Sequence, residues 1–323
     1  MVPALIFSLL AFSVVIIKAA DFVIVALRRI SKKTKTGLFA LSAVILALGT
    51  SFPELFVGIT SALEGTPELA FGVVIGSNIA NISLVAGVSA LIAGKVHVHG
   101  DFLKRDVWIA LVAGLLPILL VFDGGLGRVD GLILLAVYGA YASSFFRKRY
   151  DQIAEEHKKE NIFYRFMRKF SHVDGKITVE FGRLFLGIAL LLFSADMIVR
   201  IAKILAETAN VPVFVIGLVV LAIGTSLPEI AFSFRSLEDH QPSMFFGNLL
   251  GSTIANSTLI IGITSLVHPV KVSSVDNYFI ASITFVIVSL TFWYFIKSKL
   301  RLDRWEAAVL VLLYIIFVVV EFL

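Results

Sequence analysis

The sequence predicts an all-α polytopic membrane protein whose ten transmembrane helices form two inverted five-helix repeats, and three observations lead to this fold class. The 323 residues are 58% hydrophobic and only 16% charged, with a mean hydropathy of +0.95, which is far more apolar than an average soluble chain. Apolar stretches long enough to cross a bilayer recur along the whole chain. The chain also matches itself, without a gap, at a constant offset of 175 residues.

The apolar stretches number ten, and a helix needs about 20 such residues to cross the hydrocarbon core of a bilayer. They cover residues 3–27, 38–62, 69–94, 107–122, 129–146, 180–199, 211–236, 243–267, 278–296 and 305–323. The first is longer than the apolar core of a signal peptide and has no small-residue cleavage pattern before Asp21, so we expect a helix there. Residues 1–146 then hold the first repeat, 147–178 a polar linker and 179–323 the second repeat.

The basic residues gather in loops beside the spans, and this placement explains the net charge of +5. Arg28 and Arg29 begin a basic run after the first span, which puts that loop in the cytoplasm by the positive-inside rule. Both termini are then extracellular, and the segment 147–178 is a cytoplasmic linker with a membrane-surface helix. The rule makes nucleic-acid binding unnecessary as an explanation, and no obligatory protein partner is evident. Without any cysteine, the chain has no disulfide framework or thiolate metal site.

The internal repeat is the most specific feature of the sequence. Residues 44–87 match residues 219–262 with 19 of 44 positions identical. The identities fall mainly on Gly, Pro, Ser, Thr, Asn and Glu, whereas unrelated apolar helices would coincide at Leu, Val and Ile. Asp21 and Asp196 keep the same offset, so the duplication reaches the first helix of each half. Because five spans is an odd number, the second copy enters the membrane in the opposite sense, as in many secondary transporters.

A proline interrupts the second span of each repeat. Pro53 leaves the carbonyl of Gly49 without a helical partner, and Pro228 does the same to Gly224. We therefore expect discontinuous second and seventh helices. Freed backbone groups are tolerated at membrane depth only where they line a cavity or find other partners, so the carbonyls of residues 47–50 and 222–225 become candidate ion ligands.

Oxygen-bearing side chains surround these prolines in both repeats. Thr50 and Glu54 are four residues apart, as are Ser77 and Asn81, so each pair tends to share one helical face. The second repeat supplies the equivalent residues Thr225, Glu229, Ser252 and Asn256. Carboxylate, amide, hydroxyl and carbonyl oxygens suit Ca²⁺ and Na⁺ rather than zinc or copper. Two bidentate carboxylates and one carbonyl from each broken helix would give about six oxygens, which is enough for Ca²⁺.

A structural role for the two glutamates is the alternative to ion binding. A lone charge in the middle of a membrane costs about 3 kcal/mol or more, and Arg235 lies too close to a helix end to neutralise Glu229. Ion binding is therefore favoured for Glu54 and Glu229. Local ion pairing near helix ends explains Asp21 and Asp196, which we leave out of the site.

The small residues of the third and eighth spans have two explanations. Gly72 and Gly76 have the spacing of a close helix-packing motif. We expect the glycines to pack, while the serines and asparagines of the same spans coordinate ions.

Two sequence motifs, each present twice, carry a family resemblance. The first reads GTSFPE at 49–54 and GTSLPE at 224–229; the second reads GSNIAN at 76–81 and GSTIAN at 251–256. They resemble the paired alpha repeats of the Na⁺/Ca²⁺ exchanger family, within the cation/calcium exchanger superfamily. The chain looks like the compact microbial exchangers, which lack a large calcium-sensing domain, and its short linker agrees with that.

The resemblance implies a distribution of roles among the residues of the motifs. It implies Ca²⁺ between Glu54 and Glu229, with the carbonyls of Thr50 and Thr225. It implies sodium sites at Ser51, Ser77, Asn81, Ser226 and Ser252 with the carbonyls of Ala47 and Ala222. Many relatives have an aspartate at the position of Asn256, and this departure leaves K⁺ dependence and the Na⁺:Ca²⁺ ratio open.

We therefore expect a Na⁺/Ca²⁺ antiporter that works by alternating access, binding only its transported ions and no other cofactor. A H⁺/Ca²⁺ antiporter is the first alternative, although the related cation/proton family typically has Gly-Asn before its glutamate, where this chain has Gly-Thr-Ser. A passive channel is the second, but an occluded site with two carboxylates binds too tightly for fast flow. An enzyme is the least favoured, because no histidine accompanies the glutamates to complete a hydrolytic site.

Overall fold

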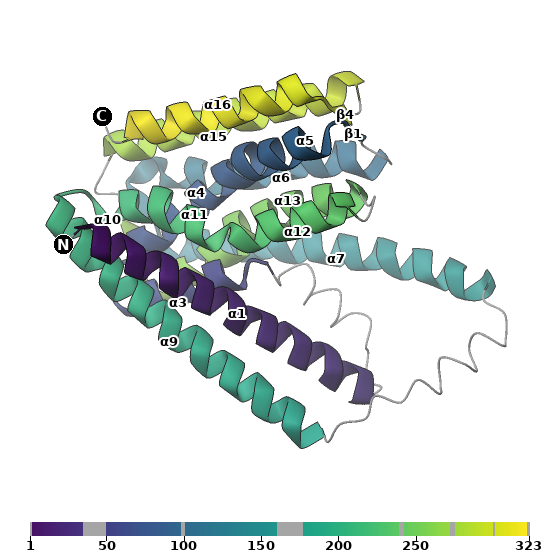
Figure 1. Ribbon diagram of the computed structural model, residues 1–323, viewed down its shortest axis with the longest axis horizontal. Coiled ribbons are helices and arrows are strands. Elements are labelled where there is room, and N and C mark those ends of the chain that lie inside the picture. The colour runs from purple at the N-terminus through teal and green to yellow at the C-terminus, as the bar shows by residue number, and fades with distance from the viewer. Residues whose placement is uncertain are drawn as a thin grey trace.

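The computed structural model describes residues 2–34, 50–97, 101–159, 177–238, 242–271, 275–299 and 301–321, which are almost entirely helical. The α-helices of the first half are α1 (Val2–Thr34), α3 (Phe52–Leu63), α4 (Pro67–Ala80), α5 (Ala86–Ala93), α6 (Asp101–Leu120) and α7 (Arg128–Lys159). Those of the second half are α9 (Ile177–Ala209), α10 (Val213–Val215), α11 (Ala222–Thr225), α12 (Leu227–Glu238), α13 (Pro242–Ile254), α14 (Ile261–Val267), α15 (Val275–Lys299) and α16 (Arg304–Glu321). The helices run roughly along the long axis of the molecule (Figure 1).

The helices lie where the ten spans were predicted. Six described stretches are long and apolar enough to cross a membrane, namely Val2–Val23, Pro67–Ala93, Val179–Ala209, Val213–Glu238, Phe245–Val267 and Tyr278–Lys299. Phe52–Leu63 and Val107–Leu120 are shorter apolar helices in the second and fourth predicted spans, and α7 and α16 occupy the fifth and tenth. Residues 38–49 of the second span lie outside the described residues. The prediction of an all-α polytopic membrane protein is confirmed.

The repeat extends well beyond the segment that revealed it. Helices α1 and α9 each have 33 residues and begin 175 positions apart. Helices α3 and α12 each have 12 residues and begin at Phe52 and Leu227, with the same offset. A π-helical segment interrupts the third span at η1 (Asn81–Val85) and the eighth at η4 (Ala255–Ile260). Duplicated sequence has therefore produced duplicated helix boundaries.

The linker differs in part from its prediction. Residues 147–159 continue α7 as one helix that runs from Arg128 to Lys159, instead of beginning a separate segment after residue 146. The remaining residues up to Ile177, where α9 starts, lie outside the described set. The long helix α7 projects from the bundle at the right of Figure 1.

Two short antiparallel strand pairs join the halves, and the all-α prediction did not include them. Strand β1 (Val96–His97) pairs with β4 (Arg301–Leu302), and β2 (Gly125–Leu126) pairs with β3 (Val270–Lys271). The registers place Val96 opposite Leu302 and Val270 opposite Leu126, and all four side chains are buried. The two pairs are equivalent under the repeat, because β1 corresponds to β3 and β4 to β2.

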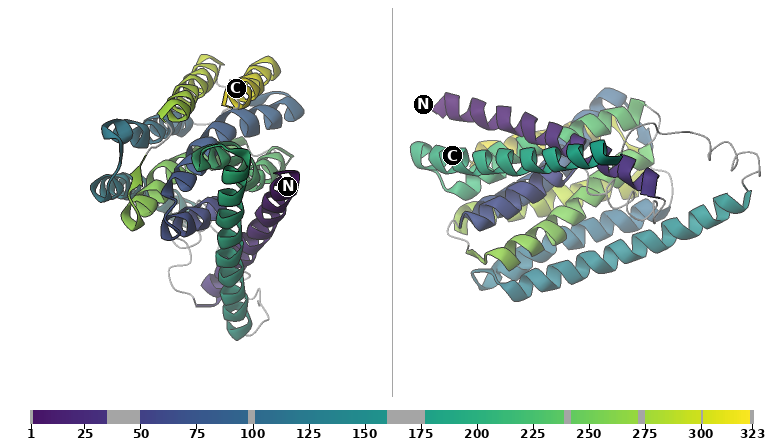
Figure 2. Two further views of the ribbon diagram at one scale, coloured as in Figure 1. Left: turned by 90° about the vertical axis from the view of Figure 1, so that its left-hand side faces the viewer. Right: turned by 90° about the horizontal axis from the view of Figure 1, so that it is seen from below.

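Helices α1 and α9 pack against each other as an antiparallel pair at one side of the bundle (Figures 1 and 2). Buried residues such as Ile16 and Ile198 form their shared core, whereas Phe7 and Phe185 are more than 70% exposed, as expected for side chains that face lipid. The carboxylate of Glu180 on α9 joins the helices by accepting from Arg29 of α1 at 3.3 Å. The two first helices of the repeats therefore form one unit.

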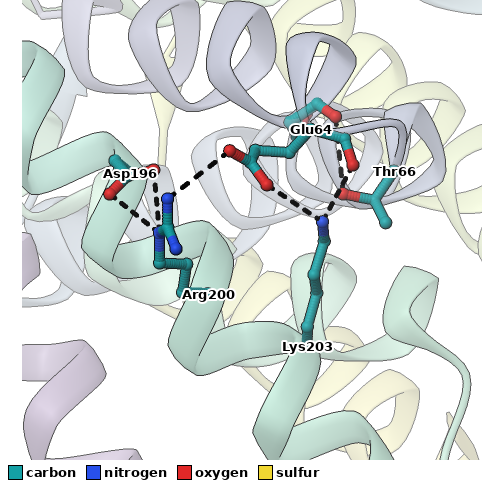
Figure 3. A network of polar contacts seen from close by, with 6 residues as sticks. Glu64, Thr66, Asp196, Arg200 and Lys203 are labelled. Carbon is teal, nitrogen blue, oxygen red and sulfur yellow. Dashed lines mark hydrogen bonds and ion pairs between the residues drawn. The ribbon is translucent and has the colours of Figure 1, made fainter.

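A polar network connects α9 to the turn between α3 and α4 (Figure 3). Arg200 Nε donates to both carboxylate oxygens of Asp196, at 3.0 and 2.9 Å, and the guanidinium lies 3.7 Å from Glu64. Lys203 donates to the backbone carbonyl of Glu64 at 2.9 Å. The predicted local pairing of Asp196 is thus present, while Asp21 is exposed. Because the network is open to solvent, we expect each ion pair to contribute about 1 kcal/mol or less.

Three glycines allow the third and seventh spans to touch backbone to backbone. A Cβ on Gly72 would collide with the carbonyl oxygen of Phe214, and one on Gly76 with that of Leu218. From the other side, a Cβ on Gly217 would collide with the carbonyl of Leu69. The predicted packing role of Gly72 and Gly76 is confirmed, and it brings together spans of different halves.

Gly72→Val should therefore destabilise the protein strongly, because the new side chain meets backbone that cannot rotate away. Overpacking of this kind costs about 1–3 kcal/mol or more. Thermal unfolding in detergent, followed by intrinsic fluorescence, measures the loss. Gly139→Ala in α7 is the matched control, since a Cβ there meets nothing within 4 Å, and it should leave the melting temperature nearly unchanged. Equal melting temperatures for the two variants would contradict this packing.

Cysteines placed at Val96 and Leu302 should form a disulfide upon mild oxidation. Partners in an antiparallel pair have Cα atoms about 4.5–5.5 Å apart, within the range of about 4.4–6.8 Å that a disulfide needs. The chain has no cysteine of its own to compete. Mass spectrometry of digested protein identifies the linked peptides. Val96→Cys combined with Leu126→Cys, one residue from each strand pair, should remain unlinked; linkage there and none in the first pair would refute the pairing.

Candidate functional site

The seventh span is interrupted beside its glutamate, as predicted; in the second span a helix begins beside the glutamate, and the residues before Thr50 lie outside the described set. In the first half, Thr50 and Ser51 form a turn before α3; in the second, Ser226 separates α11 from α12. Pro53 and Pro228 are each the second residue of the helix that follows. Proline is favoured in a first turn because its missing N–H has no helical partner there. The prolines thus begin the new helices at the break.

The backbone at the second break differs from the expectation in one respect. The carbonyl of Ala222 accepts a hydrogen bond from the backbone N–H of Ser226 at 3.1 Å, so it is not left without a partner. Its second lone pair is still available to a cation. Ala47, the equivalent residue of the first repeat, lies outside the described residues, as does Gly49.

Hydroxyl groups from the two halves pair across the site. Thr50 Oγ1 lies 3.2 Å from Ser252 Oγ, and Ser77 Oγ lies 3.3 Å from Thr225 Oγ1. The two pairs are equivalent, because each residue of one pair lies 175 positions from its counterpart in the other. Such equivalence is expected of a site on a two-fold axis that relates the repeats. Four residues predicted for the site are therefore brought together, and each contact joins the first half to the second.

The two glutamate side chains are buried within this arrangement. Glu54 is 1% exposed and Glu229 is fully buried. Ser77 donates to Glu54 Oε1 at 3.4 Å, while Glu54 Oε2 and both carboxylate oxygens of Glu229 have no hydrogen-bond partner among the described residues. No described Lys or Arg forms an ion pair with either carboxylate. Buried charges of this kind need a counter-charge or must be neutralised.

The remaining predicted side chains are also buried and short of partners. Ser51, Ser226, Asn81 and Asn256 are each at most 2% exposed. Within the part of the chain that the structure describes, the hydroxyls of both serines, both amide atoms of Asn81 and Oδ1 of Asn256 make no hydrogen bond. Since nearly all buried polar groups in proteins are hydrogen-bonded, a concentration of unpartnered oxygens in both repeats indicates a site for a ligand.

The chemistry of these groups limits the ligand to a hard cation. Among the described residues, no cluster of three or more His, Cys, Asp or Glu could hold a metal ion. A cation at this site would be held by two carboxylates and several neutral oxygens, which suits Ca²⁺ or Na⁺ better than transition metals. The π-helical turns at Asn81 and Asn256 belong to a feature that is frequent at functional sites.

Sequence reasoning missed three polar residues that contact the predicted ones. Thr50 Oγ1 donates to Asn248 Oδ1 at 3.1 Å. Asn78 Nδ2 donates to Ser257 Oγ at 2.6 Å, and Asn78 Oδ1 accepts from Asn256 at 3.3 Å. These residues were passed over because the repeat does not preserve them, since Asn248 corresponds to a valine and Asn78 to a threonine. For Asn248 the sequence did hold a signal of proximity to the site, because this residue precedes Ser252 by one helical turn and so tends to share its helical face.

Two inverted repeats, helices that begin beside the prolines of the second and seventh spans, and a buried polar site between the repeats define a secondary transporter. The family model for the sodium/calcium exchanger protein matches residues 4–147 and again 179–323. The chain therefore belongs to the sodium/calcium exchanger family.

Individual relatives agree with this assignment. The chain is 28% identical over 337 residues to the sodium/calcium exchanger MaX1 of Methanosarcina acetivorans, covering 96% of each chain. It is 30% identical over 254 residues to the inner membrane protein YrbG of Escherichia coli, covering 77% of this chain and 76% of YrbG. Its fold is similar to that of the sodium-calcium exchanger NCX_Mj soaked with 2.5 mM Na⁺ and 0.1 mM Ca²⁺, with a TM-score of 0.60, 25% identity and 99% of each chain covered.

Proposed function

We propose that this protein is a secondary active antiporter that exchanges Na⁺ for Ca²⁺ across the membrane by alternating access. The observation that carries the proposal is the burial of Glu54 and Glu229 between the repeats, where three of their four carboxylate oxygens have no hydrogen-bond partner among the described residues. A carboxylate pair without a protein counter-ion is most stable when a cation is bound. The name of the relative MaX1, a sodium/calcium exchanger, supports the choice of ions.

In this proposal Ca²⁺ binds between the two glutamates together with the backbone carbonyls of Thr50 and Thr225. Sodium ions use the flanking hydroxyls, amides and carbonyls, namely Ser51, Ser77, Asn81, Ser226, Ser252, Asn256, Ala47 and Ala222. One Ca²⁺ or two Na⁺ neutralise the pair of carboxylates, so the two loaded states have the same charge. The empty pair keeps its negative charges, which resist passage of the site through a low-dielectric region. Exchange therefore requires an ion in each direction.

The unit formed by α1 and α9 is the proposed moving element. It contacts the interrupted seventh span directly, because a Cβ on Gly224 would lie 2.5 Å from the hydroxyl oxygen of Ser13 on α1. Phe7, Phe22 and Phe185 on its outer surface are exposed to lipid, whereas the contacts of Arg200 and Lys203 with Glu64 would have to break or rearrange during such a movement. Movement of this unit past the core would change which side of the membrane reaches the carboxylates.

The orientation that we propose puts both termini outside the cell and the segment 147–178 in the cytoplasm. Both termini lie at one end of the bundle (Figure 1). Aromatic and basic side chains meet in the helices of the predicted cytoplasmic side: Lys297 lies over the ring of Trp293 at 4.5 Å, and the Trp108 and Trp293 rings are 5.9 Å apart. Tryptophan is enriched at membrane interfaces, and basic residues favour the cytoplasmic one.

Replacement of either glutamate by glutamine should abolish exchange. The assay is ⁴⁵Ca²⁺ uptake into Na⁺-loaded proteoliposomes with and without an outward Na⁺ gradient. Glu54→Gln and Glu229→Gln each remove one carboxylate from a desolvated cation, which should weaken Ca²⁺ binding at least about 100-fold (about 3 kcal/mol). Glu68→Gln, in the first turn of α4, serves as the matched control and should transport normally. Full activity in both site variants, or uptake that ignores the gradient, would defeat the proposal.

A pH gradient should not replace the Na⁺ gradient. If protons neutralised the glutamates between calcium cycles, an outward proton gradient would drive ⁴⁵Ca²⁺ uptake without Na⁺. We expect uptake at the background level of protein-free liposomes under that condition, and uptake above background once Na⁺ is loaded. Proton-driven uptake of equal size would favour the H⁺/Ca²⁺ antiporter, and flux without any counter-ion would favour a channel.

A further inference from the structure

Asn78 makes a contact that the duplicated motif does not repeat, because the second half has Thr253 at the equivalent position. Asn78 lies on α4 and is 3% exposed. Its amide nitrogen donates to Ser257 Oγ at 2.6 Å, and its amide oxygen accepts from the nitrogen of Asn256 at 3.3 Å. Three buried side chains are thus linked across the boundary between the two halves.

These hydrogen bonds determine which atom of the Asn256 amide is available to a ligand. The Asn256 amide nitrogen donates to Asn78, whereas the Asn256 amide oxygen is buried and meets no hydrogen-bond partner in the described segments. A cation can therefore bind the oxygen while the N–H group stays satisfied. This matters because a buried donor without a partner is costly.

Asn81, the counterpart of Asn256 in the first repeat, has no such support. Neither its amide oxygen nor its amide nitrogen makes a hydrogen bond with any residue that the structure describes. Thr253, which stands where a second copy of Asn78 would be, donates instead to the carbonyl of Leu249 in its own helix at 2.9 Å. A cation that binds the oxygen of Asn81 must order that amide and leave its nitrogen unpaired.

We propose that Asn78 is a positioning residue that holds the Asn256 amide with its oxygen free for the transported cation. Asn256 then becomes the stronger of the two amide ligands, and the site is asymmetric although its motifs are duplicated. The inference rests on the proposed function, in which Asn81 and Asn256 are both ligands. It adds a residue that touches no ion and acts only through Asn256.

A double-mutant cycle tests this role. Asn78→Leu keeps the branching and the number of heavy atoms of the side chain but has no hydrogen-bonding groups, so it leaves the Asn256 nitrogen unpaired. The half-saturating concentration of Na⁺ or Ca²⁺ should rise about tenfold, equivalent to 1.4 kcal/mol, for the same ion that Asn256→Ala weakens. The maximal exchange rate at saturating ion should stay nearly constant. In the Asn256→Ala background, Asn78→Leu should add less than about a twofold change, because residues that act through one contact are not additive.

Control variants separate positioning from a general packing defect. Thr253→Val changes the equivalent position of the other repeat and should leave both ion affinities within about twofold. Asn78→Thr copies the residue that the second repeat accommodates there, and it replaces Asn78→Leu in the cycle if the leucine variant does not fold. Ion-dependent shifts of the melting temperature in detergent report binding without transport.

Three outcomes would overturn the inference. The first is an unchanged ion affinity in Asn78→Leu and Asn78→Thr; the second is an equally large effect of Asn78→Leu when Asn256 is already alanine. The third is an Asn256→Ala variant with normal affinity for both ions. Any of these, with Glu54→Gln and Glu229→Gln still inactive, defeats the role of Asn78 alone, whereas active glutamate variants defeat the proposed function itself.

Discussion

Glu54 and Glu229 are buried without a basic partner among the described residues, and the rest of the structure depends on this constraint. Two carboxylates in a water-poor environment repel each other and lose their hydration. The surrounding groups are neutral oxygens, such as those of Ser77 and Ser252, which can soften this penalty but cannot cancel the charge. Since no described Lys or Arg pairs with them, a bound cation or a proton has to neutralise the two carboxylates. A site that is unstable when empty and stable when loaded is what coupling between two ion fluxes requires.

The halves complete each other around this constraint. Glu54 receives a hydrogen bond from Ser77 of its own half, and Ser77 in turn contacts Thr225 of the other half. The equivalent contact, with the roles of the halves exchanged, joins Thr50 of the first half to Ser252 of the second. The glycine contacts of the third span with the seventh and the two strand pairs tie the same halves together. Neither repeat alone can therefore assemble the site, although each carries one copy of every motif.

The sequence was sufficient to predict those structural features that occur in both repeats or that extend over many residues. Hydropathy located the helices because each span is long. The two prolines predicted the interruption that is seen in the seventh span, and the odd number of spans in each repeat predicted the inverted arrangement. The strand pairs, each with only two residues per strand, lie below the length at which alternation is readable. The π-helical turns depend on one extra residue in the hydrogen-bonding register, which apolar segments such as Ile216–Leu221 do not reveal. The hydrogen bond from Ser226 to the Ala222 carbonyl likewise depends on the local turn rather than on composition.

The residues that sequence comparison within the chain could not find are those at which the copies have diverged. Asn248 faces Thr50 where the first repeat has a valine, and Asn78 supports Asn256 where the second repeat has a threonine. Arg200, which anchors α9 beside Glu64, corresponds to Val25 in α1. A protein with two identical inverted halves would have inward-open and outward-open states of equal energy, since exchanging the halves converts one state into the other. Divergence at positions such as these is therefore what allows the two states to differ in population and in ion affinity.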